Sequence, residues 1–178
     1  MTVRHAKLSD APAISRVHTQ SWKDTYTGLM PEEFLNSRTP EKAEEHCLHI
    51  LKNLKPRGAA LVLEVEGVIA GLVYCGEQRD AVEGFDGEVY AIYVDKKFHG
   101  RGLGRELLRG AAGFLLSAGF KSLVIWVLTE NKSRGFYEKM DGVLLPRRKT
   151  GTFGGRELTE VAYGWKDLLA IAGPPPLQ

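Results

Sequence analysis

The chain has 178 residues, 43% of them hydrophobic and 26% charged, and its formal net charge is +2. This length suits one domain with a full hydrophobic core, and the small net charge argues against a nucleic-acid-binding protein, which usually carries a marked basic excess. The two cysteines, Cys47 and Cys75, are too few for a disulfide framework and lack metal-ligand spacing, so we expect no metal site.

The N-terminal residues also bear on where the protein works. The sequence MTVRHAKLSD lacks the apolar core of a signal peptide, and no segment reaches the roughly 18 apolar residues of a membrane-spanning helix. We therefore expect a cytoplasmic protein whose partners are neither nucleic acids nor membranes.

The first third of the chain predicts a strand and two helices. Residues 2–6 suit a short strand, and Ser9 or Asp10 can cap the helix that follows. Apolar and aromatic residues recur in this helix at spacings of three and four, which predicts one buried face. These residues are Ile14, Val17, His18, Trp22 and Tyr26. Gly28 and Pro31 end the helix, and a second one is expected over residues 40–53.

The remaining residues predict a sheet with further helices. Two strands over residues 60–78 are joined at Glu66-Gly67, a hairpin signal. The other expected elements, in chain order, are a strand (88–94), a helix (103–118), a buried strand (122–128), a short helix (131–140) and a closing hairpin (142–165). This order predicts an α/β (mixed α+β) fold, a central and mostly antiparallel mixed sheet flanked by helices. We expect one domain over residues 1–170 and a disordered tail over residues 171–178.

The stretch FHGRGLGREL, residues 98–107, places three glycines where a strand turns into a helix. Helix N-termini carry unpaired amides and a partial positive charge, and glycines let the backbone approach phosphate oxygens closely. The stretch therefore indicates a phosphate site, although a tight connection without a ligand is an alternative. The nucleoside-triphosphate loop is absent, and the dinucleotide fingerprint fails at Leu107, where its third glycine belongs. A nucleotide-dependent oxidoreductase stays as a second alternative.

Two motifs in order point to a family. IYVDKKFHGRGLGRELL resembles the acyl-CoA-binding motif Q/R-x-x-G-x-G/A of the GNAT superfamily of N-acetyltransferases, and NKSRGFYEKMDG resembles its second motif, an Asn that opens a helix with Phe-Tyr-Glu. VHTQSWKDTYTGLMP and EVAYGWKDL look like segments of a bacterial subgroup of uncharacterised GNAT proteins, so the resemblance spans residues 2–169. The chain departs from the family at Lys96, His99 and Asp141, which stand where Pro, Gln or Arg, and Gly are usual.

The resemblance implies that acetyl-CoA is the cofactor. Main-chain groups of one strand would pair with the pantetheine arm, and backbone amides of the glycine turn would hold the pyrophosphate. Of two residues in the second motif, the first would contact the cofactor near the thioester or the pantetheine, and the second would touch the cofactor as well. In chain order these residues are Ile92, Tyr93 and Val94; His99, Gly100, Arg101, Gly102, Leu103, Gly104 and Arg105; and Asn131 and Arg134.

The resemblance also implies the chemistry, a direct attack of a primary amine on the thioester. Tyr137 would act as general acid toward the CoA thiolate, and Glu88, which opens a strand, would act as general base. Simple alternation places Glu88, Tyr90 and Ile92 on one face, although a β-bulge would alter this parity. Packing for Tyr137 and solvent exposure for Glu88 are the structural alternatives. A non-catalytic acyl-CoA-binding regulatory module is the alternative for the whole protein.

The acceptor is expected to be a small-molecule or peptide amine. Trp22 and Tyr26 belong to the region that borders the acceptor site in the family, although their spacing also suits core packing. Glu83 and Asp86 lie in an acidic loop that would favour a cationic amine, or would simply be solvated. The closing hairpin could pair with a second copy, so a homodimer is also an expectation.

Overall fold

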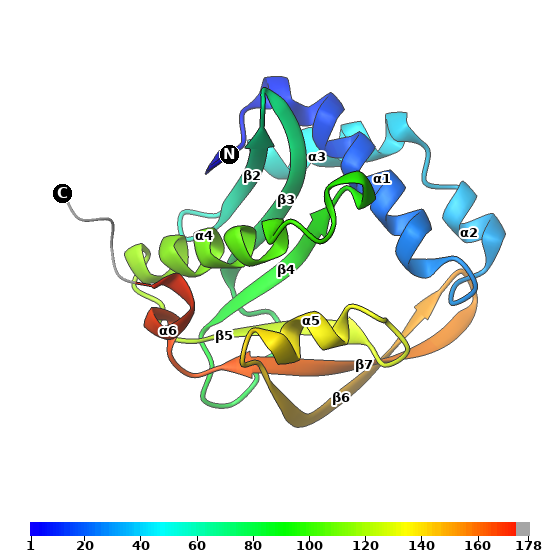
Figure 1. The fold of residues 1–178 in the computed structure, drawn as a ribbon. Helices are drawn as coiled ribbons and strands as arrows, with labels where there is room; N and C mark the ends of the chain where they lie inside the picture. Colours follow the sequence, from blue (N-terminus) through cyan, green and yellow to red (C-terminus); the bar gives the residue numbers. More distant parts are fainter. Residues whose placement is uncertain (174–178) are drawn as a thin grey trace.

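The computed structural model describes residues 1–173, which form one seven-stranded sheet with helices on both faces (Figure 1). Short 3-10 turns, η1 (Leu8–Asp10) and η2 (Lys96–Phe98), precede two of the helices. The strands are β1 (Thr2–His5), β2 (Ala59–Val65), β3 (Val68–Glu77), β4 (Gly87–Val94), β5 (Leu123–Leu128), β6 (Val143–Phe153) and β7 (Arg156–Trp165). The helices are α1 (Ala11–Tyr26), α2 (Glu32–Asn36), α3 (Pro40–Lys52), α4 (Leu103–Ser117), α5 (Arg134–Lys139) and α6 (Leu168–Ala172).

The sheet has the order β1-β2-β3-β4-β5-β7-β6, and β4 with β5 is its parallel pair. These two strands pair only where they begin, Gly87 to Val89 against Leu123 to Ile125. They then diverge, and Figure 1 shows β4 and β5 separating toward α1 and α5. Because α4 connects them, the divergence opens beside the N-terminus of a helix.

Each face of the sheet has its own helices and its own core. Leu107, Leu108 and Leu115 of α4 are buried with the side chains of one face in the largest apolar cluster. On the other face, Ile14 of α1 and Cys47 of α3 pack in a second cluster. The helices thus cover both faces of the sheet.

The structure confirms the predicted mixed sheet flanked by helices. Glu66 and Gly67 turn the β2–β3 hairpin with φ angles of 51° and 79°, the left-handed region that suits a tight turn. Within residues 1–173, no helix is both long enough and apolar enough to cross a membrane.

Two short helices, α2 and α6, were not predicted from the sequence. Helix α6 continues to Ala172, and Ile171 is buried in the main core, so the expected disordered tail begins inside a packed helix. Residues 174–178, the rest of that expected tail, lie outside the described part of the chain.

Candidate active site

A β-bulge at Tyr90 sets which β4 side chains reach each face. Tyr74 pairs with Ala91 and Cys75 with Val89, which leaves Tyr90 without an opposite residue on β3. Ile92 and Val94 consequently pack against the same core as Val89, on the α4 face. Simple alternation predicts that Glu88, Tyr90 and Ile92 share one face of the sheet. This prediction is wrong for Ile92, because the bulge reverses the alternation of side chains after Tyr90.

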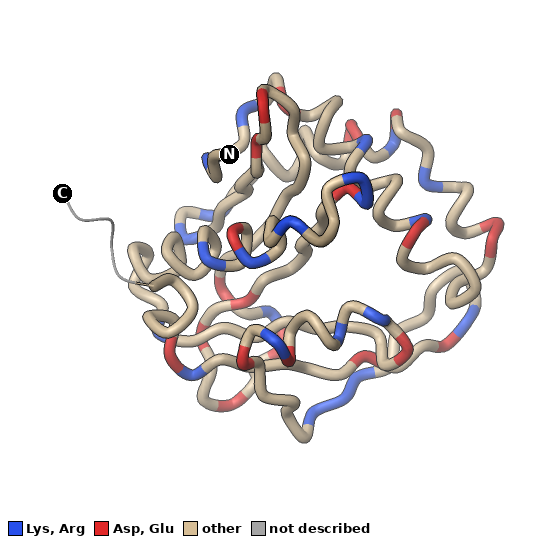
Figure 2. The backbone as a smooth tube through the Cα atoms, viewed as in Figure 1, with Lys and Arg blue, Asp and Glu red and all other residues tan. Residues whose placement is uncertain are grey.

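The glycine turn ends in an open helix N-terminus. Gly100 and Gly102 have φ angles of 76° and 78°, a conformation in which other residues are strained. The first hydrogen bond of the α4 helix runs from the Glu106 amide to the Gly102 carbonyl. The amides of residues 103–105 come before this bond and have no acceptor within the helix. Figure 2 shows basic residues at this turn and along α4. This end of α4 thus has the geometry and charge of a phosphate site.

A groove of about 860 Å³ runs from this turn to α5. Its lining includes every residue from Phe98 to Glu106, together with Ile92 and Val94 of β4 and Tyr137 of α5. A second cavity of about 230 Å³ lies between the diverging strands and is also lined by Ile92, Val94 and Tyr137. The groove and the cavity therefore adjoin at these shared residues.

The edge of β4 offers main-chain groups to this site. Beyond Val89 the register of β4 with β5 ends, although β4 stays paired with β3 as far as Val94. The Val94 carbonyl lies 2.9 Å from Nε2 of His99 and accepts a hydrogen bond from Ser21 Oγ at 3.4 Å. An extended chain in the gap can therefore pair with β4 as an added strand.

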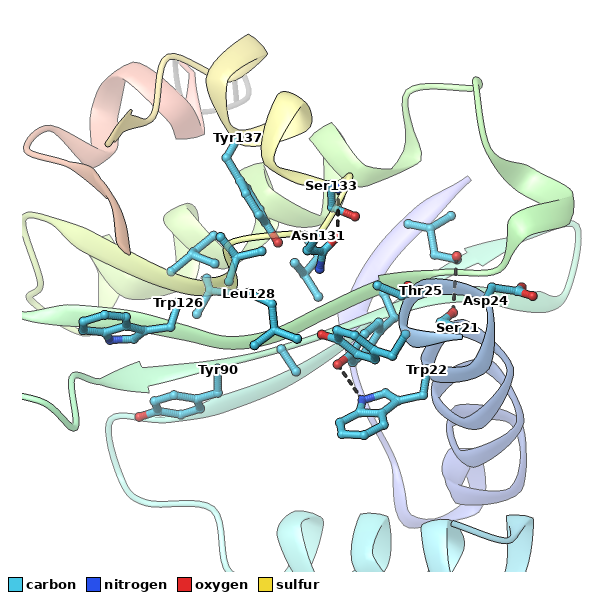
Figure 3. A pocket seen from close by; sticks show the side chains of 18 of the residues that line it. Ser21, Trp22, Asp24, Thr25, Tyr90, Trp126, Leu128, Asn131, Ser133 and Tyr137 are labelled. Atoms are coloured by element: carbon cyan, nitrogen blue, oxygen red, sulfur yellow. Dashed lines mark hydrogen bonds between the residues drawn. The ribbon is translucent and has the colours of Figure 1, made fainter. Parts of the chain in front are cut away.

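Tyr137 stands where the groove meets the cavity, and its side chain points from α5 into the cavity (Figure 3). Only 6% of the residue is exposed, and its ring packs against Tyr163 and Trp165. Burial, together with the neighbouring Tyr26, raises the pKa of Tyr137 well above its ordinary value. The hydroxyl is thus held in its protonated form, as a hydrogen-bond donor.

Asn131 also lines the cavity and is buried. Its Oδ1 accepts a hydrogen bond of 2.8 Å from the Ser133 amide, which fixes the turn into α5. Figure 3 shows Asn131 and Tyr137 pointing into the same space. The second motif therefore delivers two polar side chains to the gap between the strands.

Trp22 and Tyr26 reach the cavity from α1, on the other face of the sheet. Their ring centroids are 4.9 Å apart, and Trp22 Nε1 donates a hydrogen bond of 2.8 Å to the Tyr93 hydroxyl. The Arg38 guanidinium lies 4.1 Å from the centre of the Trp22 ring. These contacts hold an aromatic wall opposite Tyr137.

Arg134 and Glu88, two expected site residues, lie outside the linings of the groove and the cavity. Arg134 donates to the Tyr163 hydroxyl at 3.1 Å and to the Thr129 carbonyl at 2.9 Å. Glu88 is fully buried, and its carboxylate accepts hydrogen bonds from the Arg79 amide at 2.8 Å and the Arg79 guanidinium at 2.5 Å. Their functional roles stay predictions.

The acidic-loop residues Glu83 and Asp86 do not line the cavity either. Glu83 is exposed, whereas the Asp86 carboxylate accepts hydrogen bonds from the Lys121 amide at 3.0 Å and the Ser122 hydroxyl at 2.7 Å. Asp86 therefore holds the residues that lead into β5. If these two carboxylates attract a cationic acceptor, they would do so by long-range electrostatic attraction and not by direct contact in the cavity.

The cavity residues that sequence reasoning missed include Trp126 of β5, Phe153 of β6 and Glu160 of β7. Alternation in RELTEVAYGW places Glu160 on the face opposite Val161, Tyr163 and Trp165, which are buried in the α4-side core. The sequence pattern predicts which face of the sheet Glu160 occupies. Its position beside the cavity depends on the order of the strands, which the pattern does not give.

Comparison with known proteins identifies the class to which this fold and site belong. The profile of the Acetyltransferase (GNAT) family matches residues 19–142. An uncharacterised N-acetyltransferase of Bacillus subtilis is 36% identical over 171 residues, which is 96% of each chain. The chain therefore belongs to the GNAT family of acetyltransferases.

Solved structures agree with this assignment at the level of the fold. A Thermoplasma acidophilum N-acetyltransferase in complex with coenzyme A superposes with a TM-score of 0.65 at 18% identity, covering 93% of this chain and 98% of that one. A Salmonella typhimurium protein, determined with its cofactor acetyl-CoA, gives a TM-score of 0.64 at 19% identity and covers 100% and 97% of the two chains.

Proposed function

We propose that this protein transfers the acetyl group of acetyl-CoA to the nitrogen of a primary amine. The observation that carries the proposal is the adjoining pair of a groove, which begins at the glycine turn before α4, and a cavity that shares Tyr137 with it. A nucleotide with a long arm fits such a path, because its phosphates can bind at the turn while its reactive end reaches the gap. The Thermoplasma and Salmonella structures contain CoA and acetyl-CoA, which supports this choice of cofactor.

The groove residues fit the parts of the cofactor in order. The amides of residues 103–105 and the basic side chains Arg101 and Arg105 would bind the pyrophosphate. The edge of β4 from Ile92 to Val94, which β5 leaves unpaired, would pair with the amide groups of the pantetheine arm, and at Val94 the arm would replace the contacts of His99 and Ser21. On this path the thioester would lie beside Asn131 and Tyr137.

The chemistry requires a neutral amine, a stabilised oxyanion and a protonated leaving group. The amine nitrogen attacks the thioester carbonyl carbon, a C–N bond forms, and the C–S bond breaks as the oxyanion collapses. The Tyr137 hydroxyl would hydrogen-bond the departing sulfur and give it a proton. The nitrogen of the intermediate carries a proton that it must still lose, and this proton can restore the phenol.

A screen of amines tests the proposed function. Release of the CoA thiol is followed with acetyl-CoA and n-butylamine, benzylamine, spermidine, lysine and an alanine-initiated peptide, and each product is verified by mass spectrometry. We expect thiol release together with an acetylated amine from at least one of them. Binding of acetyl-CoA without any acetylated product would favour the non-catalytic module, and failure to bind acetyl-CoA would contradict both functions.

A further inference from the structure

Glu160 is a partly buried carboxylate that takes no part in the protonation of the thiolate by Tyr137. It lines the cavity from β7, with 22% of its side chain exposed, and lies opposite Leu128 in the β5–β7 register. Glu88, the other candidate base, is outside that lining and engaged by Arg79. Among the carboxylates of residues 1–173, Asp24 and Glu160 line the cavity. Asp24 is an exposed residue of α1, so Glu160 is the one held within the sheet.

Glu160 and Tyr137 lie on opposite faces of the sheet. On β7, Val161 and Tyr163 are buried in the core beneath α4, and Tyr163 packs against Tyr137. Strand alternation therefore turns Glu160 to the other face, where its register partner Leu128 packs with Tyr26 and Met30. Glu160 and Tyr137 both line the cavity between β4 and β5, so a group from each face of the sheet borders the same space.

An ammonium group already lies next to this carboxylate. Lys149 Nζ is 3.7 Å from Glu160 Oε2, 2.6 Å from Asp80 Oδ2 and 4.3 Å from the centre of the Trp126 ring. The surroundings of Glu160 are thus suited to a primary ammonium, which an incoming acceptor would also present. Lys149 is tied to Asp80 by the shorter contact, so Glu160 is its weaker partner.

We propose that Glu160 is the general base, which takes the proton that the acceptor ammonium must lose before it attacks. The proposal rests on the proposed function. The carboxylate accepts one proton from R–NH₃⁺ and leaves R–NH₂, whose lone pair attacks the carbonyl carbon on the α1 face. The thiolate departs on the α5 face toward Tyr137, and Glu160 returns its proton to solvent after the product leaves.

The charges around Glu160 suit this role. Desolvation by burial raises the pKa of Glu160 above its ordinary value, the ammonium of Lys149 opposes that rise, Asp80 adds to it and Arg79 opposes it. Tyr26 faces the same space from α1 as a neutral phenol, whose own pKa is raised by burial. A carboxylate with a raised pKa is a stronger base than an exposed one.

The test compares Glu160→Gln with Glu157→Gln, an exposed residue of the same strand, using the amine with the fastest turnover in the screen. We expect Glu160→Gln to lower kcat/KM at pH 7 by about 100-fold or more, with the loss shrinking as the pH approaches the pKa of the amine, because free amine needs no base. Calorimetric affinity for acetyl-CoA should stay within about twofold in both variants, and Glu157→Gln should keep wild-type rates.

A second variant separates proton transfer from a structural effect. Glu160→Ala opens space beside the gap, and added formate should restore part of its activity, which a folding defect would not allow. An unchanged pH profile in Glu160→Gln, or loss of the pH-dependent limb in Glu88→Gln instead, would overturn the inference while the proposed function stands. A screen in which no amine is acetylated would overturn both.

Discussion

The packing of Tyr137 and its proposed role as an acid can be tested separately, because removal of the hydroxyl oxygen leaves the ring in place. Its ring is packed in the core, and its hydroxyl has a pKa raised by burial. Tyr137→Phe keeps the ring contacts and removes the donor to the departing sulfur. We expect kcat to fall by about 100-fold, as is typical when a positioned acid is lost. Steady-state thiol release measures the change.

The control for this variant is cofactor binding, which depends on the groove and not on the phenol oxygen. Calorimetry should give the same affinity for acetyl-CoA in Tyr137→Phe and in wild type. Full turnover by Tyr137→Phe would contradict the proposed acid and return Tyr137 to a packing role.

Asp86 is expected to contribute to stability rather than to substrate binding. Burial by itself would raise the pKa of Asp86, but hydrogen bonds from Ser122 and from the Lys121 amide outweigh burial and hold the pKa below its ordinary value. Asp86→Asn should therefore lower the free energy of unfolding by about 1–3 kcal/mol at pH 7. Chemical denaturation measures this difference.

The sign of the pH dependence follows from the lowered pKa. The stability that Asp86 contributes is complete above the unfolded-state pKa of about 3.9 and is lost as the pH falls through the lower folded-state value. The gap between wild type and Asp86→Asn should thus close in acid. Glu83→Gln, at an exposed position of the same loop, is the control for stability. An increase in KM for a cationic amine in both variants would instead support the acidic-loop hypothesis.

At the scale of elements, two glycines of α4 allow a paired prediction. Gly102 caps the helix at a φ of 78°, whereas Gly113 is in the helix interior, and neither would bring an added Cβ within 4 Å of another residue. Gly102→Ala should cost roughly 1–2 kcal/mol of stability from backbone strain and weaken acetyl-CoA binding. Gly113→Ala should raise stability by about 0.5–1 kcal/mol and leave binding unchanged.

Denaturation and calorimetry on the two α4 variants give both readouts. Equal acetyl-CoA affinity in Gly102→Ala and wild type would mean that the turn does not hold the pyrophosphate. Weakened binding in Gly113→Ala would mean that the effect spreads through the whole helix.

Most elements could be predicted because their signals are local. The period of Trp22 and Tyr26 marks α1, and Glu66-Gly67 marks the β2–β3 hairpin. The five-residue α2 is too short for a periodic signal, and the β4 bulge depends on pairing with β3. The glycine turn could be recognised because it lies in one contiguous stretch, and its phosphate-binding role stays a prediction.

The acceptor side was less predictable because it is assembled from distant segments. Glu160 reaches the cavity only through the neighbouring positions of β5 and β7 in the sheet. Glu83 and Asp86 are near Glu88 in sequence, yet their contacts and exposure place them outside the cavity lining. Proximity along the chain is a poor guide where strands from different hairpins meet.

At the scale of the whole molecule, the sheet separates two approaches to one gap. The glycine turn and α5 lie with the α4 face, while Trp22, Tyr26 and Glu160 lie with the α1 face. With this arrangement the amine would enter from the α1 face while the thiolate leaves on the α4 face. The expected homodimer stays a prediction; β6 is the edge strand that a second copy would contact, and sedimentation of the full chain measures the assembly.

Thermal unfolding with acetyl-CoA, free CoA or NADH tests the groove most directly. Each ligand is supplied at about one hundred times an expected Kd, which adds about 2.7 kcal/mol to the folded state and raises the Tm by roughly 5–10 °C for a chain of this size. We predict a rise with acetyl-CoA and CoA and none with NADH. A rise with NADH alone, or with none of the three, would contradict the assignment of the groove to acetyl-CoA.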